Sequence, residues 1–397
     1  MKKLFSTVPA LLLTISLFAQ GGINFENSAW KDILAKAKLE NKMVFLDAYA
    51  SWCGPCKWMV KNIFPQKEVG DFFNQNFVCA QIDMEKGEGV DLAKKYKVKA
   101  YPTFLFMNAD GEVQYKALGS READDFLKTA SRALNPEMRL EKLKKRYDKG
   151  EHSFDLVRTY LQVLQDADEP TQEVADDFFQ KNQDDLVSKE GSQMVMDYLT
   201  DPNSPTFDFL LQHRADFENY AGKEAVSDKI YRLYQQSYRN TSTKTDSVYR
   251  IDFHAFDDAV DRIKKSGFEK ADELEGKAYI FYYDRTGDKD KYAISVVAYL
   301  ERFGAKDWQE YNSYAWYFYE NVSSPEELKK AENWARKSVA LDDNYYNEDT
   351  LASLLYKNGN YKEAETHATK AIALADADGT DHSSTDELLT KIRQAQK

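Results

Sequence analysis

The feature that most constrains this chain is a pair of cysteines that directly follows an apolar run. Residues 43–48 are apolar enough to predict a buried β-strand. The motif after them is Trp52-Cys53-Gly54-Pro55-Cys56-Lys57. A helix that starts at the first cysteine points its free N–H groups and positive dipole end at that sulfur, which favours the thiolate. We therefore expect Cys53 to attack disulfides and Cys56, one turn further on and more covered, to resolve the mixed disulfide.

Other uses of the cysteines fit the sequence less well. Three cysteines in 397 residues exclude a framework stapled by disulfides. With no second C-x-x-C and five scattered histidines, a four-ligand zinc site cannot be assembled convincingly, so no metal and no cofactor besides the redox-active Cys53–Cys56 disulfide is expected. A static disulfide is the alternative. Cys79 lies in an apolar run and is expected to be a buried apolar residue rather than a redox partner.

Strand and helix patterns alternate over the first part of the chain. The expected helices cover residues 29–39, 69–74, 90–96 and 122–133 besides the one at the cysteines, and the expected strands cover 43–48, 77–82, 103–107 and 112–118. Asn135-Pro136 breaks the last helix. This order predicts an α/β domain with a mixed sheet flanked by helices, over residues 21–135.

Three stretches together resemble the thioredoxin family: the cysteine motif, residues 47–51 before it, and residues 98–103 later on. The resemblance covers residues 24–133 and implies the thioredoxin-like fold. It also implies a cis peptide bond before Pro102, beside the disulfide, with the backbone just before that proline pairing with the substrate. Asp47 would be the buried carboxylate below Cys56 that helps to remove its proton, since burial lets a carboxyl hold its own proton longer.

The resemblance also indicates which residues meet the substrate. The expected substrate-binding residues are Trp52, Gly54, Pro55, Tyr101 and Pro102, and Lys57 is a further candidate site residue. Residues 61–65 and the helix near 69–74 look more like exported relatives, such as the C-terminal domain of the bacterial transmembrane thiol-electron transporter, than like cytosolic thioredoxin.

The N-terminus has the pattern of a signal peptide over residues 1–20. Lys2 and Lys3 precede a mostly apolar run, residues 8–18, and Ala19 is suited to cleavage. A retained membrane anchor is the alternative, but the run is shorter than the roughly 20 residues that a spanning helix needs. We expect export to the bacterial periplasm, where disulfides persist.

After Pro136 the strand signals end, and amphipathic helices follow one another. Residues 136–267 are expected to form a helical region, and residues 268–397 an all-α domain of helical repeats. Ala331 and Ala335 recur 33 residues later as Ala364 and Ala368, a period typical of helix-turn-helix solenoids. This part resembles tetratricopeptide repeats. Its tyrosine-rich stretches, residues 279–283 and 314–319, are expected to pack helices or to line a concave face that binds peptides.

The charge of the chain indicates which partners to expect. The net charge is -12, and no cluster of basic residues is interleaved with aromatic residues, so nucleic acid is not an expected partner. The expected partners are client proteins that contain disulfides, a membrane-borne thiol donor of electrons, and a protein or peptide ligand of the helical domain.

These observations favour a reductase or isomerase of protein disulfides whose helical domain selects partners. A Gly-Pro pair between the cysteines is typical of reducing members, whose potentials lie near about −270 mV. Two alternatives stay open: an interaction scaffold regulated by the redox state of the cysteines, and an oxidase that forms disulfides.

Overall fold

The computed structural model describes residues 21–246 and 248–397, so the predicted signal peptide lies outside the described residues. The chain divides into two compact units, the first ending at Ala221 and the second covering Gly222–Lys397. Within the described residues, every helix is too short or too polar to span a bilayer.

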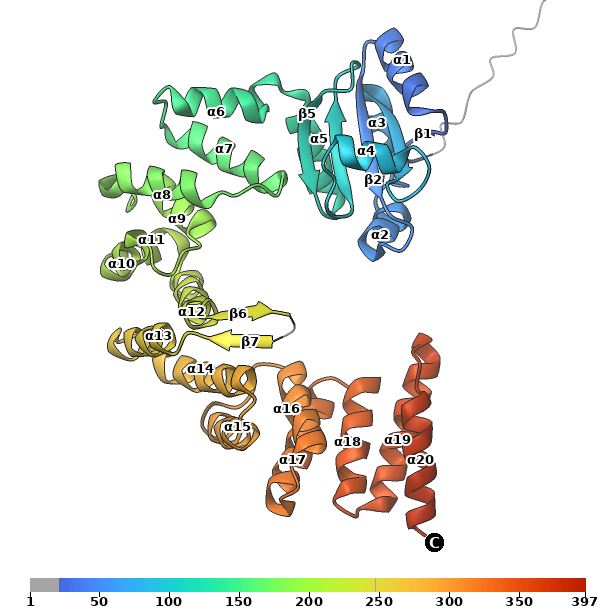
Figure 1. Cartoon of the computed structure of the whole chain (residues 1–397), viewed down its shortest axis with the longest axis vertical. Helices are drawn as coiled ribbons and strands as arrows, with labels where there is room; N and C mark the ends of the chain where they lie inside the picture. Colours follow the sequence, from blue (N-terminus) through green and yellow to red (C-terminus); the bar gives the residue numbers. More distant parts are fainter. Residues whose placement is uncertain (1–20, 247) are drawn as a thin grey trace, which may run out of the picture. The chain divides into compact units, whose positions relative to one another are not determined.

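The first unit contains the expected mixed sheet. Its strands lie in the spatial order β1-β3-β2-β4-β5, and they are β1 (Phe25–Glu26), β2 (Met43–Tyr49), β3 (Phe77–Asp83), β4 (Thr103–Met107) and β5 (Val113–Leu118). Figure 1 labels the two edge strands, β1 and β5, with β2 between them. The central strand β2 runs parallel to β3 and antiparallel to β4. The two-residue strand β1, which pairs with β3, was not predicted because it is too short to show a period.

Helices cover both faces of the sheet, and they are α1 (Trp30–Glu40), α2 (Gly54–Asn62), α3 (Lys67–Asn76), α4 (Gly89–Lys95) and α5 (Ala123–Leu134). Alternate side chains of a strand point to opposite faces. Val44 and Leu46 of β2 share a core with residues of α1 and α4. Phe45 packs on the other face against Phe73 of α3 and Phe126 of α5, with ring centroids 4.8 and 5.8 Å away. By the same alternation, Asp47 lies on the Phe45 face.

The first unit continues into helices beyond the sheet: α6 (Leu140–Asp148), α7 (Phe154–Asp166), α8 (Gln172–Lys181), α9 (Lys189–Tyr198), α10 (Pro205–Gln212) and α11 (Arg214–Ala221). Asp166, at the end of α7, is 5% exposed and connects this region to the sheet. It accepts from the Tyr115 hydroxyl of β5, from Arg121 at 3.0 Å and from Arg132 of α5 at 2.9 Å. The architecture therefore changes after α5, whereas the compact unit extends to Ala221.

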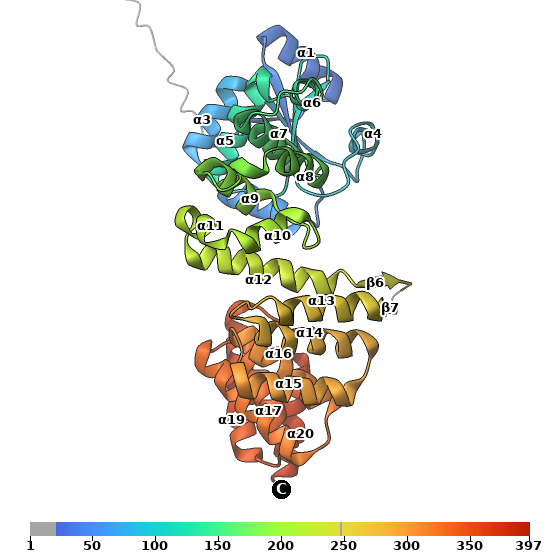
Figure 2. The ribbon, with the colours of Figure 1, turned by 90° about the vertical axis from the view of Figure 1, so that its left-hand side faces the viewer.

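The second unit is mainly helical: α12 (Lys223–Arg239), α13 (Phe253–Lys265), α14 (Ala271–Thr286), α15 (Lys289–Phe303), α16 (Trp308–Asn321), α17 (Pro325–Leu341), α18 (Tyr345–Lys357), α19 (Tyr361–Asp378) and α20 (Ser383–Ala395). Figure 2 shows α12, α13 and α14 side by side, in contact with one another. A hairpin of β6 (Ser242–Thr245) and β7 (Val248–Ile251) lies between α12 and α13. The sequence did not predict this hairpin, because its strands are short and mostly polar.

Small residues lie where the predicted helix pairs approach closely. Helix α16 packs on α17, α17 on α18, α18 on α19, and α19 on α20. Ala331, Ala335, Ala364 and Ala368 are all fully buried in one core. Gly287, which ends α14, has φ 75°, a left-handed conformation that glycine adopts without a Cβ penalty.

Candidate active site

Cys53 occupies the N-cap of α2, as its place in the motif predicts. Its backbone is extended, and its Sγ accepts a hydrogen bond from the Cys56 backbone N at 3.1 Å. Pro55 lies in the first turn, where its missing N–H costs no hydrogen bond. The first turn contains no acidic residue, so the positive end of the helix dipole acts on the Cys53 sulfur without an opposing charge from that turn.

The two cysteines form a disulfide, with Cα atoms 5.3 Å apart. Each is 2% exposed, so the expectation that Cys56 is the more covered one does not hold in this oxidised form. Both sulfurs belong to one small apolar cluster with Ala50, and Tyr101 packs against it. The assignment of Cys53 as the attacking residue therefore depends on its N-cap position, not on its exposure.

Tyr101 and Trp52 flank the disulfide. The Tyr101–Pro102 peptide bond is cis, as the resemblance implied, and Pro102 is buried. The Trp52 ring meets the Tyr101 ring edge-on, with centroids 5.9 Å apart. Trp52 is nevertheless 67% exposed, so its outer face is free to meet a polypeptide.

An acidic residue that the sequence did not reveal orients Trp52. Glu85, in the turn after β3, accepts from the indole Nε1 at 2.8 Å. Burial raises the pKa of Tyr101, and the charges of Glu85 and Asp83 raise it further. Lys86 lies beside Asp83 at 3.0 Å and donates to the Ser51 hydroxyl at 2.9 Å. The rim next to the disulfide thus combines aromatic rings with carboxylates.

Asp47 lies in β2, almost fully buried at 1% exposed. Burial raises its pKa to about 7, against a partly opposing hydrogen bond from Gln81. Gln81, paired with Asp47 across the β2–β3 register, donates from Nε2 to Oδ2 at 2.8 Å. The other oxygen, Oδ1, is buried without a hydrogen-bond partner among the described residues. Near neutral pH such a carboxyl can both hold and release a proton.

The exposed face of α2 carries the remaining predicted site residues. Gly54, Pro55 and Lys57 are exposed beside the cysteines, and Trp58 is 37% exposed on the same helix. A Cβ at Gly54 would meet nothing within 4 Å, so the space above this turn is open to a substrate.

The remaining cysteine is remote from this chemistry. Cys79 of β3 is 2% exposed, and burial raises the pKa of its thiol, so it is an inert core residue. Across residues 21–246 and 248–397, the His, Cys, Asp and Glu side chains form no group of three that could hold a metal ion. What the site can do is cycle Cys53 and Cys56 between dithiol and disulfide.

Comparison with known proteins agrees with this geometry. The family model for thioredoxin matches residues 22–132. Thioredoxin H4 of Arabidopsis thaliana is 37% identical over 98 residues, which are 25% of this chain and 77% of that protein. The thiol:disulfide interchange protein DsbD of Vibrio cholerae is 39% identical over 87 residues, which are 21% of this chain and only 14% of that protein.

A solved structure described as a putative disulphide-isomerase from Bacteroides thetaiotaomicron is also similar. It shares 44% identity and covers 29% of this chain and 95% of its own length, with a TM-score of 0.28. The family model covers the α/β domain alone and none of the helices from α6 onward.

Proposed function

The chain belongs to the thioredoxin family of thiol-disulfide oxidoreductases, and on that premise we propose that it is an exported reductase or isomerase of protein disulfides. The observation that carries the proposal is the capping of α2 by Cys53, with Cys56 in bonding contact. The signal-peptide pattern of residues 1–20 and the similarity to DsbD support export to the periplasm.

The reaction follows from the two sulfurs. The Cys53 thiolate attacks one sulfur of a client disulfide, and the other client sulfur leaves as a thiolate, which gives a mixed disulfide. Cys56 loses its proton, with Asp47 as the base that the family resemblance implies, and attacks the Cys53 sulfur. The second client sulfur then leaves, and the Cys53–Cys56 disulfide remains. A membrane-borne dithiol donor would reduce this disulfide for the next cycle.

The helical second unit would select partners. Its paired helices with buried alanines at their contacts support the proposal that they are repeats of the tetratricopeptide type, which present concave surfaces to proteins or peptides. In the competing scaffold hypothesis this unit is the functional part and the cysteines only regulate it.

Serine variants of the mature chain test the proposal. We expect Cys53→Ser to abolish the reduction of insulin, and Cys56→Ser to accumulate mixed disulfides with clients, because the resolving sulfur is missing. Cys79→Ala is the matched control and should keep normal turnover. Normal turnover in either serine variant would contradict the mechanism, and no turnover of several disulfides by the unaltered chain would favour the scaffold.

The reduction potential of the Cys53–Cys56 couple separates a reductase from an isomerase or an oxidase. A potential near about −270 mV supports a reductase, whereas a value of about −120 to −180 mV indicates an oxidase or an isomerase. Equilibration of the mature chain with dithiothreitol or glutathione buffers measures it.

A further inference from the structure

The second unit contains a pocket that is lined by aromatic and acidic residues. The pocket, about 540 Å³ in volume, lies between α16, α18 and the α19–α20 connection. Its lining residues are Asn312, Ser313, Trp316, Tyr345, Tyr346, Asp349, Thr350, Thr380, Asp381 and Ser384. Three are aromatic and two are carboxylates, and none of these described residues is lysine or arginine.

The charge of this pocket is not neutralised by its own walls. Asp349 is half-buried and accepts from the Thr385 hydroxyl at 2.7 Å, and burial raises its pKa. Hydrogen bonds from Ser383, its backbone N–H first, lower the pKa of Asp381 and keep it ionised. The neighbouring imidazole of His382 contacts Asp376 at 3.1 Å and Asp386 at 3.0 Å. The imidazole of His382 thus has two carboxylate partners of its own, and no lysine or arginine is among the described residues that line the pocket.

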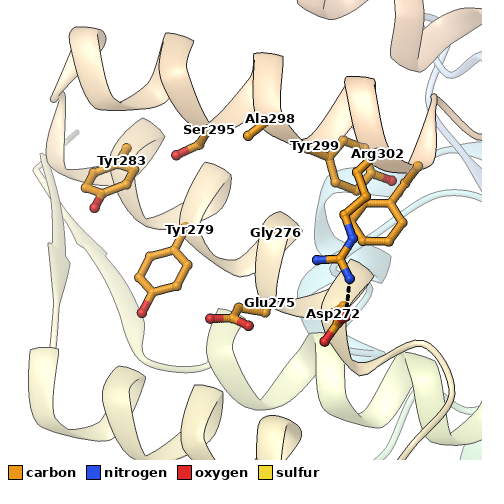
Figure 3. A pocket seen from close by; sticks show the side chains of 10 residues that line it. Asp272, Glu275, Gly276, Tyr279, Tyr283, Ser295, Ala298, Tyr299 and Arg302 are labelled. Carbon is orange, nitrogen blue, oxygen red and sulfur yellow. Dashed lines mark hydrogen bonds and ion pairs between the residues drawn. The ribbon is translucent and has the colours of Figure 1, made fainter.

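In a second pocket of the same unit, the carboxylates are paired with basic side chains. It lies between α14 and α15, with a volume of about 500 Å³, and it also contains two carboxylates and several tyrosines. There Asp272 is paired with Arg302 inside the pocket, as Figure 3 shows. Glu275 is paired with Lys264 at 3.0 Å. Both carboxylates of this pocket are thus paired with basic side chains of the chain itself.

The aromatic residues suit a cation with an apolar stem. Tyr346 is 58% exposed, and Trp316 of α16 lines the same pocket. Ring faces attract ammonium and guanidinium groups, and the methylene stems of lysine and arginine pack on such rings. The Asn312 Oδ1 is a buried acceptor without a hydrogen-bond partner among the described residues. Carboxylate, amide and hydroxyl oxygens together favour a ligand rich in N–H donors.

The neighbouring surface indicates that the ligand is a chain molecule. A further pocket, lined by residues of α12, α14 and α16, includes Glu310 and Tyr314 of the same helix that supplies Asn312 and Trp316. Helix α16 therefore lines two pockets, one beside α12 and α14 and one beside α18. An extended polypeptide is long enough to reach from one to the other, whereas a small amine would fill one pocket alone.

We propose that the pocket between α16, α18 and the α19–α20 connection binds a lysine or arginine side chain of an extended polypeptide segment. The carboxylates of Asp349 and Asp381 hold the cation, and Trp316 and Tyr346 pack on its stem. The site lies in the second unit, so it acts in binding and not in the chemistry at Cys53.

Fluorescence anisotropy with the full mature chain tests this site. The probes are short labelled peptides of identical Gly/Ser framework with arginine, lysine, glutamine or glutamate at the centre. The arginine and lysine peptides should bind at least about tenfold more tightly than the glutamine peptide, and the glutamate peptide least tightly. Asp349→Asn and Asp381→Asn should each weaken binding of the arginine peptide about tenfold.

Controls separate this result from misfolding and from other ligands. Asp290→Asn removes an exposed carboxylate outside the pocket and should leave binding unchanged. Tyr346→Leu alters a ring that is 58% exposed, and it should weaken binding several-fold. Equal binding of the arginine and glutamine peptides would overturn the proposal, as would tighter binding of the free amine spermidine than of the peptides. Turnover of a small disulfide should be unaffected in all variants, so failure here is distinct from failure of the proposed enzymatic function.

Discussion

The buried carboxyl of Asp47 makes the stability of the first unit depend on pH. Its pKa is about 7 in the folded chain, against about 3.9 in an unfolded chain. The folded state therefore binds the proton more tightly, and the stabilisation from protonated Asp47 is complete below about pH 4 and is lost as the pH rises through about 7. The difference between these two pKa values corresponds to about 4 kcal/mol.

Asp47→Asn removes this titration while keeping an oxygen for Gln81. Between about pH 5 and about pH 8 the free energy of unfolding of the unaltered chain should fall by about 2.5 kcal/mol more than that of the variant. Urea denaturation of the oxidised protein at both pH values measures the difference. Asp32→Asn, at an exposed position of α1, should follow the unaltered chain. Parallel curves for Asp47→Asn and the unaltered chain would show that Asp47 does not titrate in this range.

Gln81→Met tests the partner of this carboxyl. The substitution keeps the length of the side chain but removes the hydrogen bond that lowers the pKa of Asp47. The pKa of Asp47 should therefore rise above its value of about 7. Titration of the carboxyl carbon by NMR measures it, and an unchanged or lower pKa would rule out this role for Gln81.

What could be predicted for single residues depends on how far apart in the sequence their partners lie. The cysteine roles follow from a local motif, and the role of Asp47 came from the family resemblance. Gln81 and Glu85 escaped prediction because they meet Asp47 and Trp52 across 34 and 33 residues. These contacts depend on the register of β2 against β3 and on the turn that follows, which residue periodicity does not specify.

At the scale of elements, Asp166 of α7 joins the helices after the sheet to β5 and α5. Asp166→Ala would leave Arg121 and Arg132, whose side chains are 10% and 21% exposed, without this carboxylate. Removing one partner of a buried ion pair costs about 3 kcal/mol or more. We expect a loss of that order in the free energy of unfolding, measured by urea denaturation. Asp155→Ala, exposed at the start of α7, should cost under about 1 kcal/mol, and equal losses in the two variants would contradict a connecting role for Asp166.

Elements were predictable where their apolar pattern was long. The buried strand at 43–48 and the helix at 122–133 correspond to β2 and α5 with small shifts at the ends. Strand β1 has two residues, and the hairpin β6–β7 has four residues in each strand. Such strands are defined by their partner rather than by a pattern of their own.

At the scale of the whole molecule, the change of architecture and the limit of the first compact unit lie at different places. The sheet and its helices end with α5 at Leu134, whereas the unit ends at Ala221. The sequence reveals the change of architecture, because strand patterns stop near Pro136. It does not reveal where the compact unit ends, because a contact such as Tyr115 to Asp166 spans 51 residues and leaves no periodic signal.

Two truncations distinguish these limits. A fragment of residues 21–221 retains Asp166 and its partners, so it should unfold cooperatively and reduce a small disulfide within about twofold of the full mature chain. A fragment of residues 21–135 loses Asp166 and exposes Tyr115 and Arg132, and its free energy of unfolding should be lower by about 3 kcal/mol. Urea denaturation and turnover of a small disulfide give both quantities. Equal stability of the two fragments would mean that the helices up to α11 add nothing to the thioredoxin domain, and that the ion pairs of Asp166 are neutral in free energy.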